Sequence, residues 1–129
     1  MMKRIVVAVG VVLRNHEVFI SHRDSSRHQG GKWEFPGGKV EDNESVSDAL
    51  LRELKEEINI DVISQQPFMV IEFDYPDKHV SLDIHLVTEF AGEPKQLEGQ
   101  EARWVALQDL GNYEFPEANK PIVEKLLSM

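Results

Sequence analysis

Alternating apolar and polar positions predict two β-hairpins in this chain. Ile5–Leu13 is a run of mostly β-branched residues, and Glu17–His22 continues it after a short polar turn. Farther along, Phe68–Tyr75 alternates apolar with acidic residues, and Val80–Phe90 alternates apolar with polar ones. Pro76–Lys78 between them has the composition of a turn. We therefore expect one hairpin near the N-terminus and another in the later half of the chain.

A helical period separates the two hairpins. Apolar residues recur at i+4 spacing and predict a helix over Ser45–Ile58: Val46, Leu50, Leu54 and Ile58. Leu51 lies beside them on the helical wheel. We expect these apolar residues, Leu51 included, to form one arc that faces the core.

Shorter segments complete the expected architecture. Asp24–Lys32 is polar and typical of a loop, and Trp33–Phe35 is a short extended piece stopped by Pro36–Gly38. Arg103–Ala106 predicts another strand, and Pro121–Leu127 a closing helix with proline at its start. Strands on both sides of one central helix, followed by a terminal helix, predict an α/β sandwich with a mixed sheet. With no repeat or linker, we expect one domain over residues 1–129.

Composition narrows the class of protein. The 129 residues fit one domain, and 41% hydrophobic residues suffice for a core. Cysteine is absent, which excludes disulfides, thiolate metal sites and a cysteine nucleophile. No apolar run approaches the roughly 20 residues of a membrane span, and the first residues lack a signal-peptide cleavage pattern. The net charge of −9 argues against non-specific nucleic-acid binding. We expect a soluble, cytoplasmic monomer without membrane or nucleic-acid partners.

Three glutamates of the predicted helix suggest a metal site. Glu53, Glu56 and Glu57 are i+3 and i+4 neighbours, so they share one arc. That arc borders the apolar one, and we therefore expect all three carboxylates to be partly shielded from water. Clustered carboxylate oxygens suit hard divalent cations such as Mg²⁺, with Mn²⁺ as a possible substitute. The alternative is an ordinary solvated helix surface.

The segments beside these glutamates add to the metal hypothesis. Gly37 and Gly38 allow a close approach of the backbone, where a carbonyl can serve as a further ligand. Glu44, just before the helix, is a candidate to hold the loop or to act through water. Arg52 is placed to orient a carboxylate.

The spacing of these residues resembles the signature of the Nudix hydrolase family. Gly38 is followed after five residues by Glu44, and after seven more by Arg52-Glu53-Leu54. Glu56-Glu57 and Asn59-Ile60 complete the pattern, each after one further residue. Asn59 stands where the family has glycine, and asparagine is the next residue best able to adopt the left-handed conformation that ends a helix.

Other segments resemble one branch of that family, the MutT-type diphosphatases acting on oxidised guanine nucleotides. These segments are WEFPGGKVE, FDYPDKHVSLDIHLV, GEPKQLEGQEARWV and FPEANKPIVEKL. The resemblance implies a Nudix α/β/α sandwich with a mixed β-sheet between helices. It further implies hydrolysis of 8-oxo-dGTP, and of 8-oxo-GTP, to the monophosphate and pyrophosphate. Such an enzyme removes oxidised nucleotides from the pool and so prevents replication errors.

The same resemblance implies roles for individual residues. Metal ligands would be Glu53, Glu56, Glu57, Glu98 and the Gly37 carbonyl. Glu53 is the first candidate for the base that activates water and Glu98 the second, with Glu44 and Arg52 in support. Residues that contact the nucleotide would be Arg23, His28, Glu34, Phe35, Pro36, Gly37, Lys78 and Asn119. Lys78 stands where the family often has arginine, which would weaken a bidentate contact.

Several alternatives remain open at this stage. Asn119 suits the edge of a purine because it both donates and accepts, but an asparagine before a proline-led helix is also a typical cap. The same helix would serve a Nudix enzyme for other nucleoside triphosphates, such as pyrimidine nucleotides. A catalytically silent domain that only binds nucleotide, or a buffer of divalent cations, are further possibilities.

Overall fold

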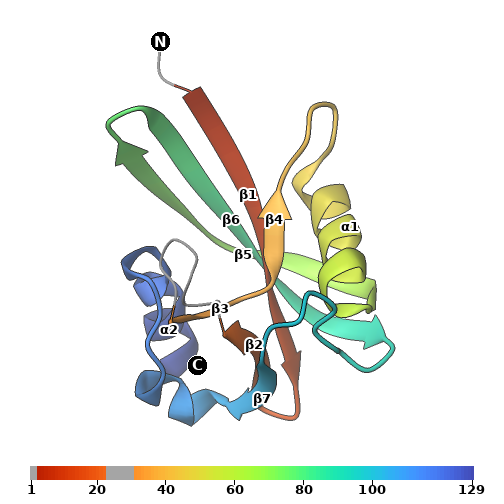
Figure 1. Cartoon of the computed structure of the whole chain (residues 1–129). Helices are drawn as coiled ribbons and strands as arrows, with labels where there is room; N and C mark the ends of the chain where they lie inside the picture. Colours follow the sequence, from red (N-terminus) through yellow and green to blue (C-terminus); the bar gives the residue numbers. More distant parts are fainter. Residues whose placement is uncertain (1–2, 23–30) are drawn as a thin grey trace.

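The computed structural model describes residues 3–22 and 31–129. Figure 1 shows a sheet flanked by two helices, α1 and α2. The elements follow one another along the chain as β1 (Lys3–Arg14), β2 (Glu17–His22), β3 (Trp33–Glu34), β4 (Gly37–Lys39), α1 (Val46–Ile58), β5 (Asp61–Tyr75), β6 (Lys78–Ala91), β7 (Ala102–Ala106), the 3₁₀ turns η1 (Leu107–Asn112) and η2 (Glu117–Asn119), and α2 (Lys120–Leu127).

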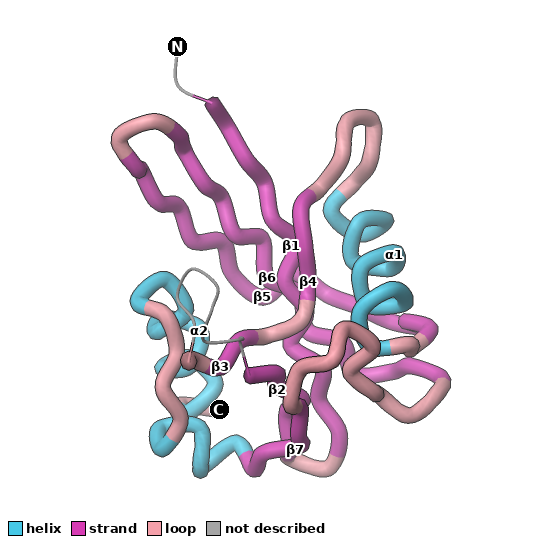
Figure 2. Tube along the Cα trace, in the orientation of Figure 1, coloured by secondary structure: helices cyan, strands magenta, loops and turns pink. Residues whose placement is uncertain are grey.

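The sheet is mixed and has β1 at its centre. Its strand order is β3-β2-β1-β6-β5, with β4 paired to β1 and β7 paired to β2. β1 runs parallel to β6, and the other pairings are antiparallel. The tube in Figure 2 shows β4 beside β1 and, after β4, a loop that leads into α1. The predicted mixed α/β architecture is therefore confirmed.

The second hairpin is longer than predicted. β5 begins at Asp61 and not near Phe68, and the turn is shorter because β6 already begins at Lys78. Pairing between β5 and β6 shifts register three times between Val62 and Met69. Such bulges break the two-residue alternation on which a strand prediction rests, which explains the missed half of β5.

Two hydrophobic clusters, one on each face of the sheet, hold the layers together. On one face Leu50, Leu54 and Ile58 of α1 are fully buried against Ala8 and Val12 of β1 and their neighbours. On the other face a second cluster joins the sheet to η1 and α2, and includes Val11, Ile84, Leu110, Ile122 and Leu126. Burial of these side chains stabilises the fold by about 25 cal/mol per Å² of apolar surface.

One apolar residue of α1 does not follow the prediction. Leu51 is 41% exposed, because the buried arc of the helix is narrower than the helical pattern suggests. Both ends of α1 do match the expected chemistry. The Ser45 hydroxyl accepts a hydrogen bond from the Asp48 N–H at 3.0 Å, and Asn59 ends the helix in the left-handed conformation with φ of 57°.

The glycines after Trp33–Phe35 form a strand that the sequence did not predict. β4 pairs antiparallel with β1, with Gly37 opposite Val9 and Gly38 opposite Ala8. Glycine is uncommon in strands because it costs backbone entropy and offers no side chain to pack. Here the missing side chains are required: a Cβ at Gly37 would lie 2.1 Å from the Ala8 carbonyl oxygen.

In the described part of the chain, no helix is long and apolar enough to cross a membrane.

Candidate active site

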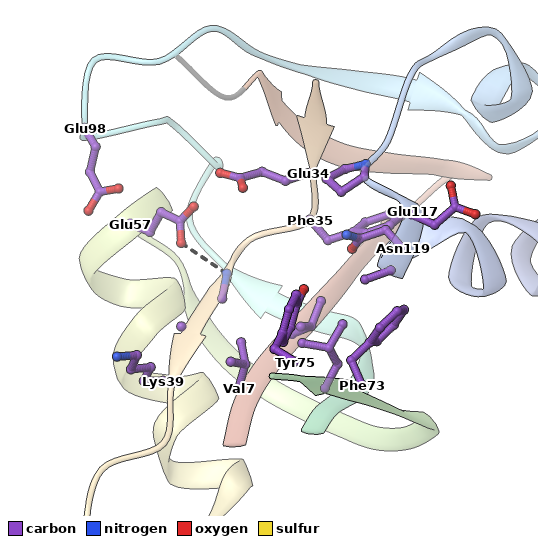
Figure 3. A pocket seen from close by; sticks show the side chains of 16 residues that line it. Val7, Glu34, Phe35, Lys39, Glu57, Phe73, Tyr75, Glu98, Glu117 and Asn119 are labelled. Atoms are coloured by element: carbon purple, nitrogen blue, oxygen red, sulfur yellow. Dashed lines mark hydrogen bonds between the residues drawn. The ribbon is translucent and has the colours of Figure 1, made fainter. Parts of the chain in front are cut away.

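A cavity of about 670 Å³ opens between α1, β4, the end of β5 and η2. Figure 3 shows Glu57 and Glu98 together at one end of this cavity, with Asn119 and Phe73 at the other. We call these the acidic end and the Asn119 end. The side chains and backbone that line the cavity belong to Val7, Val9, Glu34, Phe35, Gly37, Gly38, Lys39, Glu57, Phe73, Tyr75, Leu82, Glu98, Pro116, Glu117, Ala118 and Asn119.

Glu57 is the most deeply buried acid of the acidic end. Only 7% of its surface is exposed, and its carboxylate accepts a hydrogen bond from the Gly37 N–H at 3.1 Å. Burial raises the pKa of Glu57 to about 8, and the negative charges of Glu34, Glu98 and Glu53 act in the same direction. The bond from Gly37 opposes this rise only in part. The protein thus holds a carboxyl group that lacks a neutralising charge.

Glu53 packs against the backbone of β4. A Cβ at Gly38 would meet the Glu53 carboxylate at 2.3–2.6 Å, so that only glycine leaves room for it. The same carboxylate accepts a hydrogen bond from Arg52 Nη1 at 2.7 Å. Glu53 is therefore held between the backbone of one strand and a neighbouring guanidinium.

Arg52 connects Glu53 to the loop before the helix. Its Nε and Nη2 donate to the two oxygens of Glu44 at 2.9 Å each, and Nη2 also donates to the Lys39 carbonyl at 3.0 Å. This donation, together with the Glu41 N–H bond, lowers the pKa of Glu44 to about 2. The fork of donors fixes the Arg52 side chain in the way that guanidinium–carboxylate pairs do.

Glu56 and Glu98 differ in their placement. The Glu56 side chain is 61% exposed and lies 3.6 Å from Arg52, so the expectation that it would be shielded is wrong. Glu98 lines the cavity, and its loop is docked on the end of α1 because the Leu97 N–H donates to the Glu57 carbonyl at 2.9 Å. The helix thus positions Glu98 although 41 residues separate it from Glu57.

The acids of this end are oxygen donors that fit a divalent cation. Glu57 carries a buried, uncompensated carboxyl group, and Glu53 and Glu98 contribute further negative charge to it. A hard cation would relieve this repulsion. Among residues 3–22 and 31–129, however, no three acidic or histidine side chains are yet gathered closely enough to form a ligand group. Glu56 points to solvent, so rotation of its side chain would have to accompany metal binding.

The Asn119 end combines aromatic side chains with one amide. Phe35 is buried and stacks on Phe115 with ring centroids 5.1 Å apart, while one side of Phe35 lines the cavity. Asn119 precedes α2, but its side chain makes no capping hydrogen bond and lines the cavity instead. The capping interpretation of Asn119 is therefore wrong.

Other residues expected at the nucleotide are placed as follows. Glu34 lines the cavity, and the Pro36 carbonyl accepts a hydrogen bond from Gly10 N–H at 2.8 Å. Lys78 does not line the cavity; its ammonium group lies over the Tyr75 ring, 5.4 Å from the centroid. Arg23 and His28 lie outside the described residues.

Several lining residues were not expected from the sequence. Val7, Val9 and Leu82 form the floor of the cavity, and Phe73 and Tyr75 line it from β5. The alternation of Phe73 and Tyr75 indicated that both point to one face of a hairpin. The pattern did not show whether that face of the strand packs in the core or lines a cavity.

Comparison with known proteins identifies the family of this fold and site. The NUDIX domain family model matches residues 8–125. An 8-oxo-dGTP diphosphatase of Escherichia coli is 40% identical over 126 residues, covering 97% of this chain and 98% of that protein. A CTP pyrophosphohydrolase of Escherichia coli is 29% identical, covering 99% and 95% of the two chains. Among solved structures, MutT from work on Aliivibrio salmonicida and Vibrio cholerae is 47% identical, with a TM-score of 0.86 and 98% of both chains covered. The chain belongs to the NUDIX domain family.

Proposed function

We propose that this protein hydrolyses 8-oxo-dGTP, and 8-oxo-GTP, to the nucleoside monophosphate and pyrophosphate. The observation that carries the proposal is the cavity itself, in which the buried carboxyl of Glu57 faces one space with the amide of Asn119, which makes no capping hydrogen bond. A nucleotide has a polyanionic end and a hydrogen-bonding base, and these match the two ends of the cavity. Relatives named 8-oxo-dGTP diphosphatase support the same substrate.

The acidic end would hold the metal and the phosphates. Glu53, Glu56, Glu57 and Glu98, with the Gly37 carbonyl, would bind Mg²⁺, or Mn²⁺ in its place. A bound divalent ion neutralises phosphate oxygens and promotes ionisation of water. Nudix hydrolases use divalent metal ions in general, which agrees with the uncompensated charge at Glu57.

The chain itself would supply the positioned base. Hydrolysis adds one water: its oxygen bonds to phosphorus, the P–O bond that bridges the α and β phosphates breaks to separate the monophosphate from pyrophosphate, and a proton of the water passes to a carboxylate. Glu53 suits this role because Arg52 and Gly38 fix its carboxylate in one place. Glu98 is the second candidate because its loop is docked on α1 beside Glu57. Arg52 and Glu44 would hold the base without touching the substrate.

The Asn119 end would read the base. Guanine and 8-oxoguanine differ in hydrogen-bond polarity at N7, and a site with unpaired polar groups for the wrong base can discriminate strongly. The Asn119 amide offers a donor and an acceptor, and neither is used by the helix it precedes. Phe35 and the apolar floor would sandwich the ring, and Glu34 lies beside it.

The test is to identify the products. Purified protein is incubated with 8-oxo-dGTP and Mg²⁺, and the products are separated by ion-exchange chromatography. The proposal predicts 8-oxo-dGMP and pyrophosphate, with no turnover after the metal is chelated. Release of 8-oxo-dGDP and orthophosphate, or turnover that persists with chelator, would reject it. The Glu56→Gln and Glu57→Gln variants are assayed in the same way as a matched pair. Each removes one carboxylate of the acidic end, which is exposed in Glu56 and buried in Glu57.

A further inference from the structure

Among the described residues, the hydroxyl group of Tyr75 faces the cavity without a hydrogen-bond partner. Tyr75 is the last residue of β5 and lines the cavity, and it is 40% exposed. Within the described residues, its side-chain contacts are made by the ring: Phe73 stacks on it at 6.4 Å, and the Lys78 ammonium lies over it at 5.4 Å. The hydroxyl oxygen therefore keeps both its donor and its acceptor capacity.

Two neighbours in the hairpin, Phe73 and Lys78, contact the ring that carries this hydroxyl. Tyr75 pairs with Lys78 across the hairpin, directly beside the two-residue turn. On the opposite face of the same strands, the His79 ring contacts the carboxylates of Asp74 and Glu72 and ties β6 to β5. A side chain whose ring is contacted on both sides of its hairpin position loses less rotamer freedom when its hydroxyl forms a hydrogen bond.

The position of Tyr75 lies between the two ends of the cavity. Figure 3 shows its ring between the side chains of Glu57 and Asn119, with the hydroxyl directed into the cavity. If the phosphates occupy the acidic end and the base the Asn119 end, the sugar must span the space between them. A sugar hydroxyl is itself a donor and an acceptor, so it complements a tyrosine hydroxyl better than a phosphate or an apolar ring face does.

We propose that the Tyr75 hydroxyl forms a hydrogen bond with a hydroxyl of the substrate sugar and is a specificity-determining residue for that sugar. This inference rests on the proposed function, since it requires the nucleotide to lie with its phosphates at Glu57 and its base at Asn119. Asn119 and Tyr75 then divide recognition between them: Asn119 reads the base, and Tyr75 reads the sugar. If position 75 only lined the cavity with apolar surface, phenylalanine would serve as well as tyrosine.

The test compares Tyr75→Phe with the parent protein on three substrates: 8-oxo-GTP, 8-oxo-dGTP and the 2′,3′-dideoxy analogue of 8-oxo-GTP. This change removes one oxygen atom and keeps the ring stacked on Phe73. Tyr113→Phe is the matched control, because the Tyr113 ring packs on Trp33 and does not line this cavity. Thermal unfolding of both variants checks that the fold is retained.

We expect Tyr75→Phe to lower kcat/KM roughly 3- to 10-fold on a substrate that carries the recognised hydroxyl, as for loss of one neutral hydrogen bond. The dideoxy analogue should be turned over at the same kcat/KM by both proteins. Loss on both natural sugars would indicate the 3′-hydroxyl, and loss on 8-oxo-GTP alone the 2′-hydroxyl.

Two results would overturn the inference while leaving the proposed function intact. One is an equal loss on all three substrates, which would place the hydroxyl at the base or in packing. The other is unchanged kcat/KM on all three. If the parent protein turned over none of them, the proposed function would fail, and this inference with it.

Discussion

The carboxylate of Glu57 accepts a hydrogen bond from the backbone N–H of Gly37, 20 residues away, and is otherwise buried among acids. This pairing joins the helix that carries the signature glutamates to the glycine strand beside it. One neutral N–H does not compensate a buried negative charge. A cation bound beside Glu57 would compensate this charge, and without one the buried carboxylate lowers the stability of the protein.

Glu57→Gln should stabilise the metal-free protein at alkaline pH. Because the folded-state pKa of Glu57 is raised to about 8 from 4.5, its contribution to stability is complete below pH 4.5 and is lost as pH rises through 8. Glutamine keeps the acceptor for Gly37 and does not ionise. In chelator, the melting temperature of the variant should exceed that of the parent at pH 8.5 and equal it near pH 4.5.

The same melting temperatures are then measured with Mg²⁺ in place of the chelator. Mg²⁺ should raise the melting temperature of the parent protein at pH 8 and have little effect on Glu57→Gln. Glu56→Gln is the control for the measurement in chelator, since the exposed Glu56 carboxylate makes no comparable contribution to metal-free stability. A Glu57→Gln protein that is less stable than the parent at pH 8.5 would contradict this account.

Gly38→Ala should lower kcat strongly while leaving the protein folded. The new Cβ would lie 2.3–2.6 Å from the Glu53 carboxylate, which can swing away because it ends a flexible side chain. Displacement of a catalytic group by about 1 Å costs on the order of 100-fold in rate. We expect kcat to fall on the order of 10- to 100-fold with a small change in melting temperature.

Gly111→Ala is the matched control, because its Cβ would meet only Leu127, at 3.9 Å, among the described residues. Wild-type kcat in Gly38→Ala would show that the position of Glu53 does not matter for catalysis.

Gly37→Ala should behave differently from Gly38→Ala. Its Cβ would press on the Ala8 carbonyl, part of the rigid backbone of β1, so the fold itself should be destabilised.

Arg52→Lys should lower kcat and leave KM largely unchanged. Arg52 donates to both Glu44 oxygens and to Glu53 at once, and a lysine ammonium cannot reproduce that fork. Steady-state kinetics on 8-oxo-dGTP tests this, with Lys55→Arg on the exposed face of α1 as the control. An increase in KM with unchanged kcat would instead place Arg52 in substrate binding.

Asn119→Ala should erode discrimination more than catalysis. The amide is not needed by α2, so the helix should remain stable. Loss of its hydrogen bonds should reduce kcat/KM for 8-oxo-dGTP about tenfold or more, with a smaller effect on dGTP. If both substrates lose equally, Asn119 does not read the difference between the bases.

Local chemistry explains what the sequence predicted well. The ends of α1 are determined by Ser45 and Asn59, whose side-chain and backbone preferences act over a few residues. The i+4 pattern likewise predicted the buried Leu50, Leu54 and Ile58. The spacing of the Nudix signature then supplied the glutamates.

Long-range packing explains what the sequence could not predict. Glu56 and Glu57 are adjacent in the sequence, yet one is exposed and the other buried, because β4 and the loop after Lys95 cover only one side of the helix end. The bulges that hid the first half of β5 and the cavity-facing side of Tyr75 depend equally on distant strands.

The most direct test of the two-ended nucleotide site is kcat/KM with Mg²⁺ for 8-oxo-dGTP, dGTP and CTP, measured side by side. The account predicts a preference for 8-oxo-dGTP over dGTP on the order of 100-fold or more, and still slower turnover of CTP. Comparable values for 8-oxo-dGTP and dGTP, or faster turnover of CTP, would contradict the account.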